Sequence, residues 1–315
     1  MLKRSRRSGL TLIGAAMLMG GALAGLATPQ SAPGVPVSMV VTVEPRRGKT
    51  APNIEKEDVA VTENKDKRPV TGLLPLEGEH ANMQLLLLLD DSAASSLDTE
   101  IQTLKQFVNS LPSTTQVAVG YMRNGMTELT QNFTADHGAA ANSIRVVMGP
   151  GGADVSPYDS LSDAIRKWPQ SQAERREIIM ISSGIEGLGG GYTSDNPYVS
   201  KGIADAQRAG VVVYTIYTPA VGHFGHSFWR ANWGQNFLAQ LSEETGGESY
   251  FLGLGPVVSF QPYLNEILER QRHQFLLTFS ARPESKAGLQ YVKVRIKEKD
   301  ADISAADRVY VPASL

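Results

Sequence analysis

The chain of 315 residues contains no cysteine. Without cysteine it has no disulfide bonds, no thiolate zinc ligands and no cysteine nucleophile, so its stability must come from packing. It also lacks the Gly-x-Ser-x-Gly turn of serine hydrolases, and its glycine clusters at 149–152 and 187–191 are not followed by Gly-Lys-Ser/Thr. Phosphate-binding loops need that continuation. These absences exclude several common classes of enzyme.

Residues 1–27 have the layout of an export signal. Basic residues stand at the start, an apolar stretch runs from about Leu10 to Met19, and small residues offer cleavage points after Ala24 or Ala27. The alternative is a permanent membrane anchor, but the glycine-broken stretch is shorter than the ~20 residues that span a bilayer. We therefore expect an exported protein, periplasmic or secreted, with no stable membrane insertion after cleavage.

The net charge of the chain does not favour binding of nucleic acid. Residues 1–27 hold four of the 30 basic residues and none of the 32 acidic ones, so their removal changes the net charge from −2 to −6. A mildly acidic chain has no electrostatic footprint for binding nucleic acid.

Apolar runs alternate with amphipathic helical patterns over residues 82–273. Strands that are apolar on both faces and alternate with helices predict an α/β domain with a doubly wound, mostly parallel sheet of the Rossmann type. MTELTQNFT is expected to add an edge strand. The expected strands are 84–90, 116–121, 177–182, 211–217 and 249–252, and the expected helices are 97–110, 136–147, 158–168, 198–209, 235–244 and 260–272.

Both ends of the mature chain have strand-like patterns. Residues 34–75 contain β-branched runs separated by charged turns, and residues 274–315 contain three segments that alternate apolar and polar side chains. Each piece alone has too few strands to be stable. We therefore expect the two pieces to form one small β domain.

Two carboxylates stand where the first buried strand is expected to end. The run from Leu85 to Leu89 leads into Asp90, Asp91 and Ser92. In an open α/β sheet, ligands bind at the carboxyl ends of the strands, and carboxylate and hydroxyl oxygens suit a hard cation. Part of the cluster has a second interpretation, because Ser96 or Asp98 can cap the helix that follows.

The run ending Asp-x-Ser and the order of strands and helices resemble the von Willebrand factor A family. In that family an Asp-x-Ser-x-Ser motif, a later threonine and a later aspartate build a metal-ion-dependent adhesion site. Here Ala94 replaces the second serine, Ser156 is the candidate for the threonine position, and Ser183 stands at the aspartate position. The segments on either side of 82–273 resemble an acidobacterial branch of exported proteins of this type.

The resemblance implies a noncatalytic adhesion or scaffolding module whose metal site is degenerate. Asp90, Ser92 and Ser156 would be the remaining ligands, too few and too weakly charged for tight Mg²⁺ or Mn²⁺ binding unless Asp91 or Asp154 contributes. We expect no cofactor beyond weak binding of these ions. The alternative hypothesis is a metal-dependent enzyme that uses Asp90 and Asp91.

An aromatic segment is the candidate for contact with a protein partner. TPAVGHFGHSFWRANWGQ, residues 218–235, contains Phe228, Trp229 and Trp233. Tryptophan and arginine are enriched among interface hot spots, and Trp229 is followed by arginine. Burial of these aromatic side chains beneath the segment is an equally open interpretation. His223 and His226 lack a third zinc ligand nearby, so a zinc site is not expected there.

Overall fold

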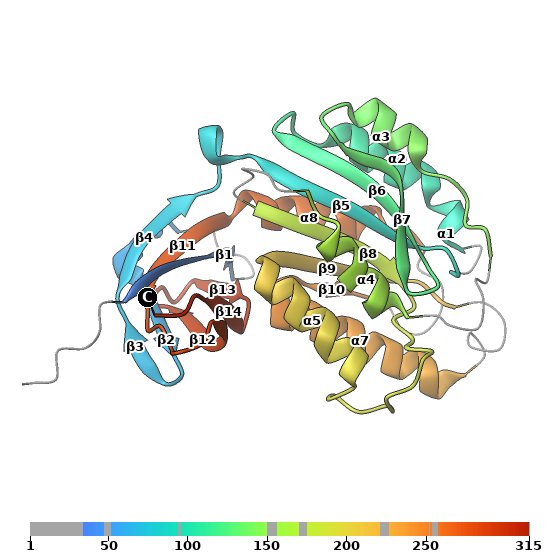
Figure 1. Cartoon of the computed structure of the whole chain (residues 1–315). Helices are drawn as coiled ribbons and strands as arrows, with labels where there is room; N and C mark the ends of the chain where they lie inside the picture. The colour runs from blue at the N-terminus through green and yellow to red at the C-terminus, as the bar shows by residue number, and fades with distance from the viewer. Residues whose placement is uncertain are drawn as a thin grey trace, which may run out of the picture. The chain divides into compact units, whose positions relative to one another are not determined.

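Six strands form the central sheet of the chain, in the order β10-β9-β8-β5-β6-β7 (Figure 1). All pairs are parallel except β6 with β7. Every residue of β5 is buried, as expected for a strand that is covered on both faces. The strands are β5 (Met83–Asp90), β6 (Thr115–Arg123), β7 (Met126–Thr134), β8 (Arg175–Ser182), β9 (Val211–Tyr217) and β10 (Ser249–Tyr250).

Helices cover both faces of this sheet, so the expected doubly wound α/β fold is confirmed. One apolar core lies between the sheet and α1, α2, α3 and α8, and a second lies between the sheet and α4, α5 and α7. The helices are α1 (Ser96–Thr99), α2 (Ile101–Ser110), α3 (His137–Ser143), α4 (Pro157–Arg166), α5 (Pro197–Ala209), α7 (Phe228–Thr245) and α8 (Gln261–Arg272).

Structure is described in this computed structural model for part of the chain. The described residues are 34–46, 52–93, 96–149, 156–169, 175–220, 227–251, 253 and 258–314. The expected export signal, Ala94, Asp154, His223 and His226 lie outside them. No helix among the described residues is long and apolar enough to cross a membrane.

Two expected helix boundaries were wrong. Helix α3 ends at Ser143 rather than at residue 147, because Ile144 is extended and the amide groups of Val147 and Met148 donate to carboxylates instead. Helix α7 begins at Phe228 rather than at residue 235. The Ser227 side chain caps it by accepting a hydrogen bond from the Arg230 amide at 3.3 Å.

The remaining strands form two four-stranded sheets, in the orders β13-β1-β11-β4 and β14-β12-β2-β3. Strands from both ends of the chain pair in them: β1 with β11, and β2 with β12. Residues 34–315 form one compact unit, so a separate small β domain stays a prediction. The bounds are β1 (Val35–Pro45), β2 (Val59–Glu63), β3 (Asp66–Arg68), β4 (Val70–Pro75), β11 (Gln274–Ala281), β12 (Gly288–Ile296), β13 (Ala301–Ala305) and β14 (Arg308–Val311), with short 3₁₀ turns η1 (Lys56–Asp58) and η2 (Gly78–His80).

Candidate functional site

The candidate site lies where the strand order reverses direction. Strands β5 and β8 are neighbours, and the chain continues from β5 toward β6 on one side and from β8 toward β9 on the other. Loops diverge at such a switch point and leave room for a ligand at the carboxyl ends of the strands. Asp90 ends β5 and Ser182 ends β8, so both side chains stand at this edge.

Asp90 is bound by the hydroxyl groups of its neighbours. Its side chain is buried, and Oδ1 accepts hydrogen bonds from Ser92 Oγ at 2.6 Å and from the Ser92 amide at 3.0 Å. Oδ2 accepts a hydrogen bond from Ser182 Oγ at 2.8 Å. Three of the roughly four lone-pair positions of the carboxylate are thereby filled by the chain itself.

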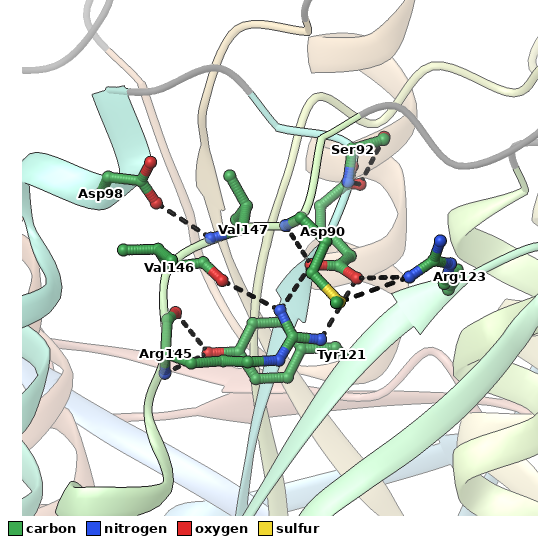
Figure 2. Close-up of polar contacts among 10 residues, drawn as sticks. Asp90, Ser92, Asp98, Tyr121, Arg123, Arg145, Val146 and Val147 are labelled. Carbon is green, nitrogen blue, oxygen red and sulfur yellow. Dashed lines mark hydrogen bonds and ion pairs between the residues drawn. The ribbon is translucent and has the colours of Figure 1, made fainter.

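Asp91 forms an ion pair with Arg145, which Figure 2 labels beside Tyr121. Arg145 Nη1 donates to Oδ1 at 2.8 Å and Nη2 to Oδ2 at 3.2 Å, and the Met148 amide donates to Oδ1 at 2.9 Å. Burial by itself raises the pKa of this carboxyl. The hydrogen bonds from Arg145 and Met148 and the charges of Arg145 and Arg123 outweigh burial, and the pKa of Asp91 lies below its ordinary value.

Arg145 is fixed on three sides. Its guanidinium lies over the Tyr121 ring, with Cζ 3.8 Å from the ring centroid, an arrangement typical of a cation–π contact. The Tyr121 hydroxyl donates to the Arg145 carbonyl at 2.7 Å and accepts from the Arg145 amide at 2.8 Å. The pair with Asp91 is therefore held by the core of the domain rather than by two mobile surface side chains.

Ser156 caps helix α4 and contacts a carboxylate that the sequence did not single out. Its Oγ accepts from the Asp159 amide at 3.1 Å and donates to Glu186 Oε2 at 2.7 Å. Burial raises the pKa of Glu186, against the effect of the hydrogen bonds from Ser156 and the Leu188 amide. Ser156 thus acts first as a helix cap, as is common for serine before a first-turn aspartate.

The structure brings Asp90, Ser92 and Ser156 together. All three line one cavity of about 10 Å³. That is about the space that a single water molecule needs. Asp91 and Arg123 line the same cavity. Ser183 takes a different role, because it is buried and its Oγ accepts a hydrogen bond from the Ile185 amide at 3.4 Å.

These residues do not fit a divalent cation. Mg²⁺ needs a near-octahedral set of oxygen ligands. Asp90 already accepts three hydrogen bonds, Asp91 is paired with Arg145, and the Arg123 guanidinium lines the cavity that a cation would enter. Within the described residues, no group of three or more His, Asp or Glu side chains is placed to hold a metal ion.

The three aromatic candidates lie at the start of α7, on a helix rather than on a loop. Phe228 is 74% exposed and Trp229 is 61% exposed, whereas Trp233 is half-buried against the core. Trp233 lies with its ring centroid 6.0 Å from that of Trp229 and 5.6 Å from that of Phe237. Partner contact therefore stays a prediction for all three, and Trp233 also has a packing role.

Four side chains of the site were missed at the level of sequence: Arg123, Arg145, Ser182 and Glu186. Arg123 had a local signal, since it precedes Asn124-Gly125, the strongest short signal for a two-residue hairpin turn. Arg145 had none, because the sequence placed it inside a helix. Ser182 and Glu186 flank Ser183, to which the motif comparison drew attention.

No protein family and no curated protein matches the sequence. Solved structures similar to it include an aerotolerance-related membrane protein from Bacteroides fragilis, with 15% identity, 60% of this chain and 98% of that chain covered, and a TM-score of 0.44. The vWF domain of the type V pili tip protein Mfa5 from Porphyromonas gingivalis has 12% identity, covers 60% of this chain and 94% of its own, and has a TM-score of 0.43. Likeness at this level assigns neither a family nor a function, and the fold class rests on the sheet order of the chain itself.

Proposed function

We propose that the chain is an exported, noncatalytic protein-binding module that meets its partner at the carboxyl ends of its parallel strands, without a metal ion. The observation that carries the proposal is the contrast at this edge. The carboxylates Asp90 and Asp91 are bound by hydroxyl and guanidinium groups of the chain, while Phe228 and Trp229 are exposed.

The aromatic side chains and the carboxylates belong to the same edge of the sheet. Helix α7 follows the loop after β9, and Ala220 in that loop forms a β-bridge with Ala93, which follows β5. Phe228 and Trp229 are neighbours in the sequence, contiguous exposed apolar patches often mark interaction sites, and tryptophan is enriched among interface hot spots. An edge with exposed aromatic side chains and internally paired carboxylates favours contact with another protein over metal-dependent catalysis.

Capture from an envelope extract of the source organism tests the proposal. The chain beginning at Thr28 is the bait, EDTA is present throughout, and the captured protein is purified for affinity measurements. We expect Trp229→Ala to weaken its binding by about 2 kcal/mol or more, as for a hot-spot tryptophan, with little change in melting temperature.

The matched control is Tyr291→Ala on β12, since Tyr291 is 57% exposed and Trp229 is 61% exposed. The control variant should bind as tightly as the unchanged chain. Equal affinities of the partner for all three proteins would contradict binding at the carboxyl ends of the parallel strands. A large fall in the melting temperature of Trp229→Ala with unchanged affinity would assign that tryptophan to packing.

A further inference from the structure

Arg123 at the end of β6 is a guanidinium with few partners. Its side chain is 41% exposed, and Nη1 lies 3.6 Å from Asp91 Oδ2 and 3.4 Å from Met148 Sδ. Within the part of the chain that the structure describes, Nε and Nη2 of Arg123 have no partner. Because Arg145 already binds both oxygens of Asp91, one carboxylate serves two guanidinium groups.

Two exposed methionine side chains adjoin this arginine. Met126 is 59% exposed and Met148 is 67% exposed. Met126 is the cross-strand partner of Arg123, and Met148 receives its hydrogen bond. Side chains directly opposite each other on paired strands lie on the same face of the sheet. We call Arg123, Met126 and Met148 the Arg123 surface.

The hairpin that carries Arg123 and Met126 has a fixed geometry. The two residues between them, Asn124 and Gly125, have φ angles of 50° and 69°. This is the left-handed pair of a two-residue hairpin turn, whose twist matches that of the flanking strands. Glycine adopts such a φ without strain, so the turn holds Arg123 and Met126 side by side.

The segment that carries Met148 is also fixed. The Val147 amide donates to Asp98 Oδ1 at 2.9 Å (Figure 2). The Met148 amide donates to Asp91 Oδ1 at 2.9 Å. Side chains along the extended segment alternate in exposure: Arg145 and Val147 are partly buried, whereas Val146 and Met148 are exposed. The backbone that carries Met148 is thus held in place before any partner arrives, which lowers the entropy cost of binding.

We propose that the Arg123 surface binds a segment of the partner in which one carboxylate is flanked by apolar side chains. The inference rests on the proposed function, because it names the partner chemistry at the same edge. The Nε and Nη2 atoms of a guanidinium form a fork that matches the two oxygens of a carboxylate. Among the described residues, the nearby acidic groups have other partners. Asp90 is bound by hydroxyls, Asp91 is shared with Arg145, Asp159 is paired with Lys201, and exposed Glu128 acts on Arg145.

A selection from random displayed peptides tests the proposal without a known partner. The chain beginning at Thr28 is immobilised, and the enriched peptides are synthesised with each Asp or Glu and with the corresponding Asn or Gln. We expect the enriched peptides to share an acidic residue next to large apolar residues. Loss of the acid, or the change Arg123→Gln, should weaken binding by about tenfold or more, since either change removes one partner of a charge-assisted pair.

Arg208→Gln on α5 is the matched control, because the Arg208 side chain is 54% exposed and has one acidic partner, Asp205. Its affinity for the peptides should equal that of the unchanged chain. The proposal is overturned if no peptide is enriched, if the amide versions bind as well as the acids, or if Arg123→Gln binds the peptides as the control does.

The same peptides separate this inference from the proposed function. Binding that is lost in Trp229→Ala but kept in Arg123→Gln would support binding at the carboxyl ends of the parallel strands. It would also show that the Arg123 surface takes no part in that binding. Binding that neither change affects would contradict both proposals.

Discussion

The two ends of the central sheet use charged residues in opposite ways. At the amino ends of the strands, Glu177 is fully buried and accepts hydrogen bonds from Gln271 at 2.6 Å and Gln274 at 2.7 Å. Arg175 beside it donates to the Gln274 side chain and the Gln271 carbonyl, both at 2.7 Å. At the carboxyl ends, Arg123 is half-exposed among exposed apolar side chains.

The comparison separates charged side chains that stabilise the fold, such as Glu177, from an exposed one that can contact a partner, Arg123. The Glu177 network joins β8 to α8 and β11, which connects the parallel sheet to the antiparallel strands. The side chains of this network are buried and hydrogen-bond within the chain, except that Arg175 Nε has no partner among the described residues. At the carboxyl ends of the parallel strands, hydrogen-bond donors and apolar side chains are exposed. Substitutions of these exposed side chains should therefore affect binding more than stability.

The largest effect on stability is expected for Glu177→Ala. Removing the carboxylate leaves the amide donors of Gln271 and Gln274 buried without their acceptor, and each unpaired buried donor costs about 1 to 3 kcal/mol of unfolding free energy. Urea unfolding of the chain measures the change. Glu128→Ala removes an exposed carboxylate and should cost less than about 0.5 kcal/mol; equal losses for the two variants would contradict the comparison.

A smaller effect is expected for Arg145→Ala. It breaks a bidentate pair and a cation–π contact at the partly exposed edge, for a loss of about 2 kcal/mol. The Met148 amide should lose protection in hydrogen exchange, since Arg145 no longer fixes the Asp91 carboxylate that accepts its hydrogen bond. Arg123→Gln, which removes a long ion pair on the same carboxylate, should stay within about 0.5 kcal/mol of the unchanged chain. Protection that persists in Arg145→Ala would show that Asp91 and Asp98 hold the segment without Arg145.

The pH dependence of stability should have opposite signs at the two ends. The pKa of Asp91 lies below 3.8, so its stabilising contribution is present above that pH and is lost as the pH falls through the folded-state pKa. Burial raises the pKa of Glu177 above 4.5, so its contribution is full below that pH and is lost as the pH rises through the folded-state pKa. The loss of stability at acid pH should therefore be smaller in Asp91→Asn than in the unchanged chain, because one carboxyl with a lowered pKa is removed. An unchanged loss at acid pH would show that Asp91 is not paired in solution.

The smallest effect is expected from metal ions. Calorimetric titration with Mg²⁺ or Mn²⁺ should give dissociation constants no tighter than about 1 mM, because the oxygen ligands of the edge are already engaged. Ala94→Ser combined with Ser183→Asp adds the two expected ligands that the sequence lacks and serves as the comparison variant. Micromolar binding by the unchanged chain would mean that Asp91 leaves Arg145 to act as a ligand.

The sheet was predictable from the sequence because its signal is local. The run Leu85–Leu89 and the alternation of apolar runs with helical patterns predicted a doubly wound, mostly parallel sheet. The stretch MTELTQNFT predicted the edge strand β7. The helix boundaries failed where distant carboxylates override local preference. Asp98 accepts a hydrogen bond from the Val147 amide and Asp91 from the Met148 amide. No sequence pattern within residues 136–147 predicts these contacts.

The site was only partly predictable for the same reason. The cluster of Asp90, Ser92 and Ser156 followed from the topology of the fold, since strand ends and helix starts meet at one edge. The partner of Asp91 is 54 residues away in sequence, and the partner of Ser156 is 30 residues away. Pairings over such distances are set by the packing of whole elements, so a single sequence does not specify them.

The most direct test of the account is the affinity of the purified partner for the chain beginning at Thr28, measured in EDTA and again in excess Mg²⁺. If guanidinium and hydroxyl groups stand in place of metal ligands at the edge, the two affinities should be equal within error. A loss of about tenfold or more in EDTA, reversed by Mg²⁺, would show that a cation takes part in binding and would contradict the central claim.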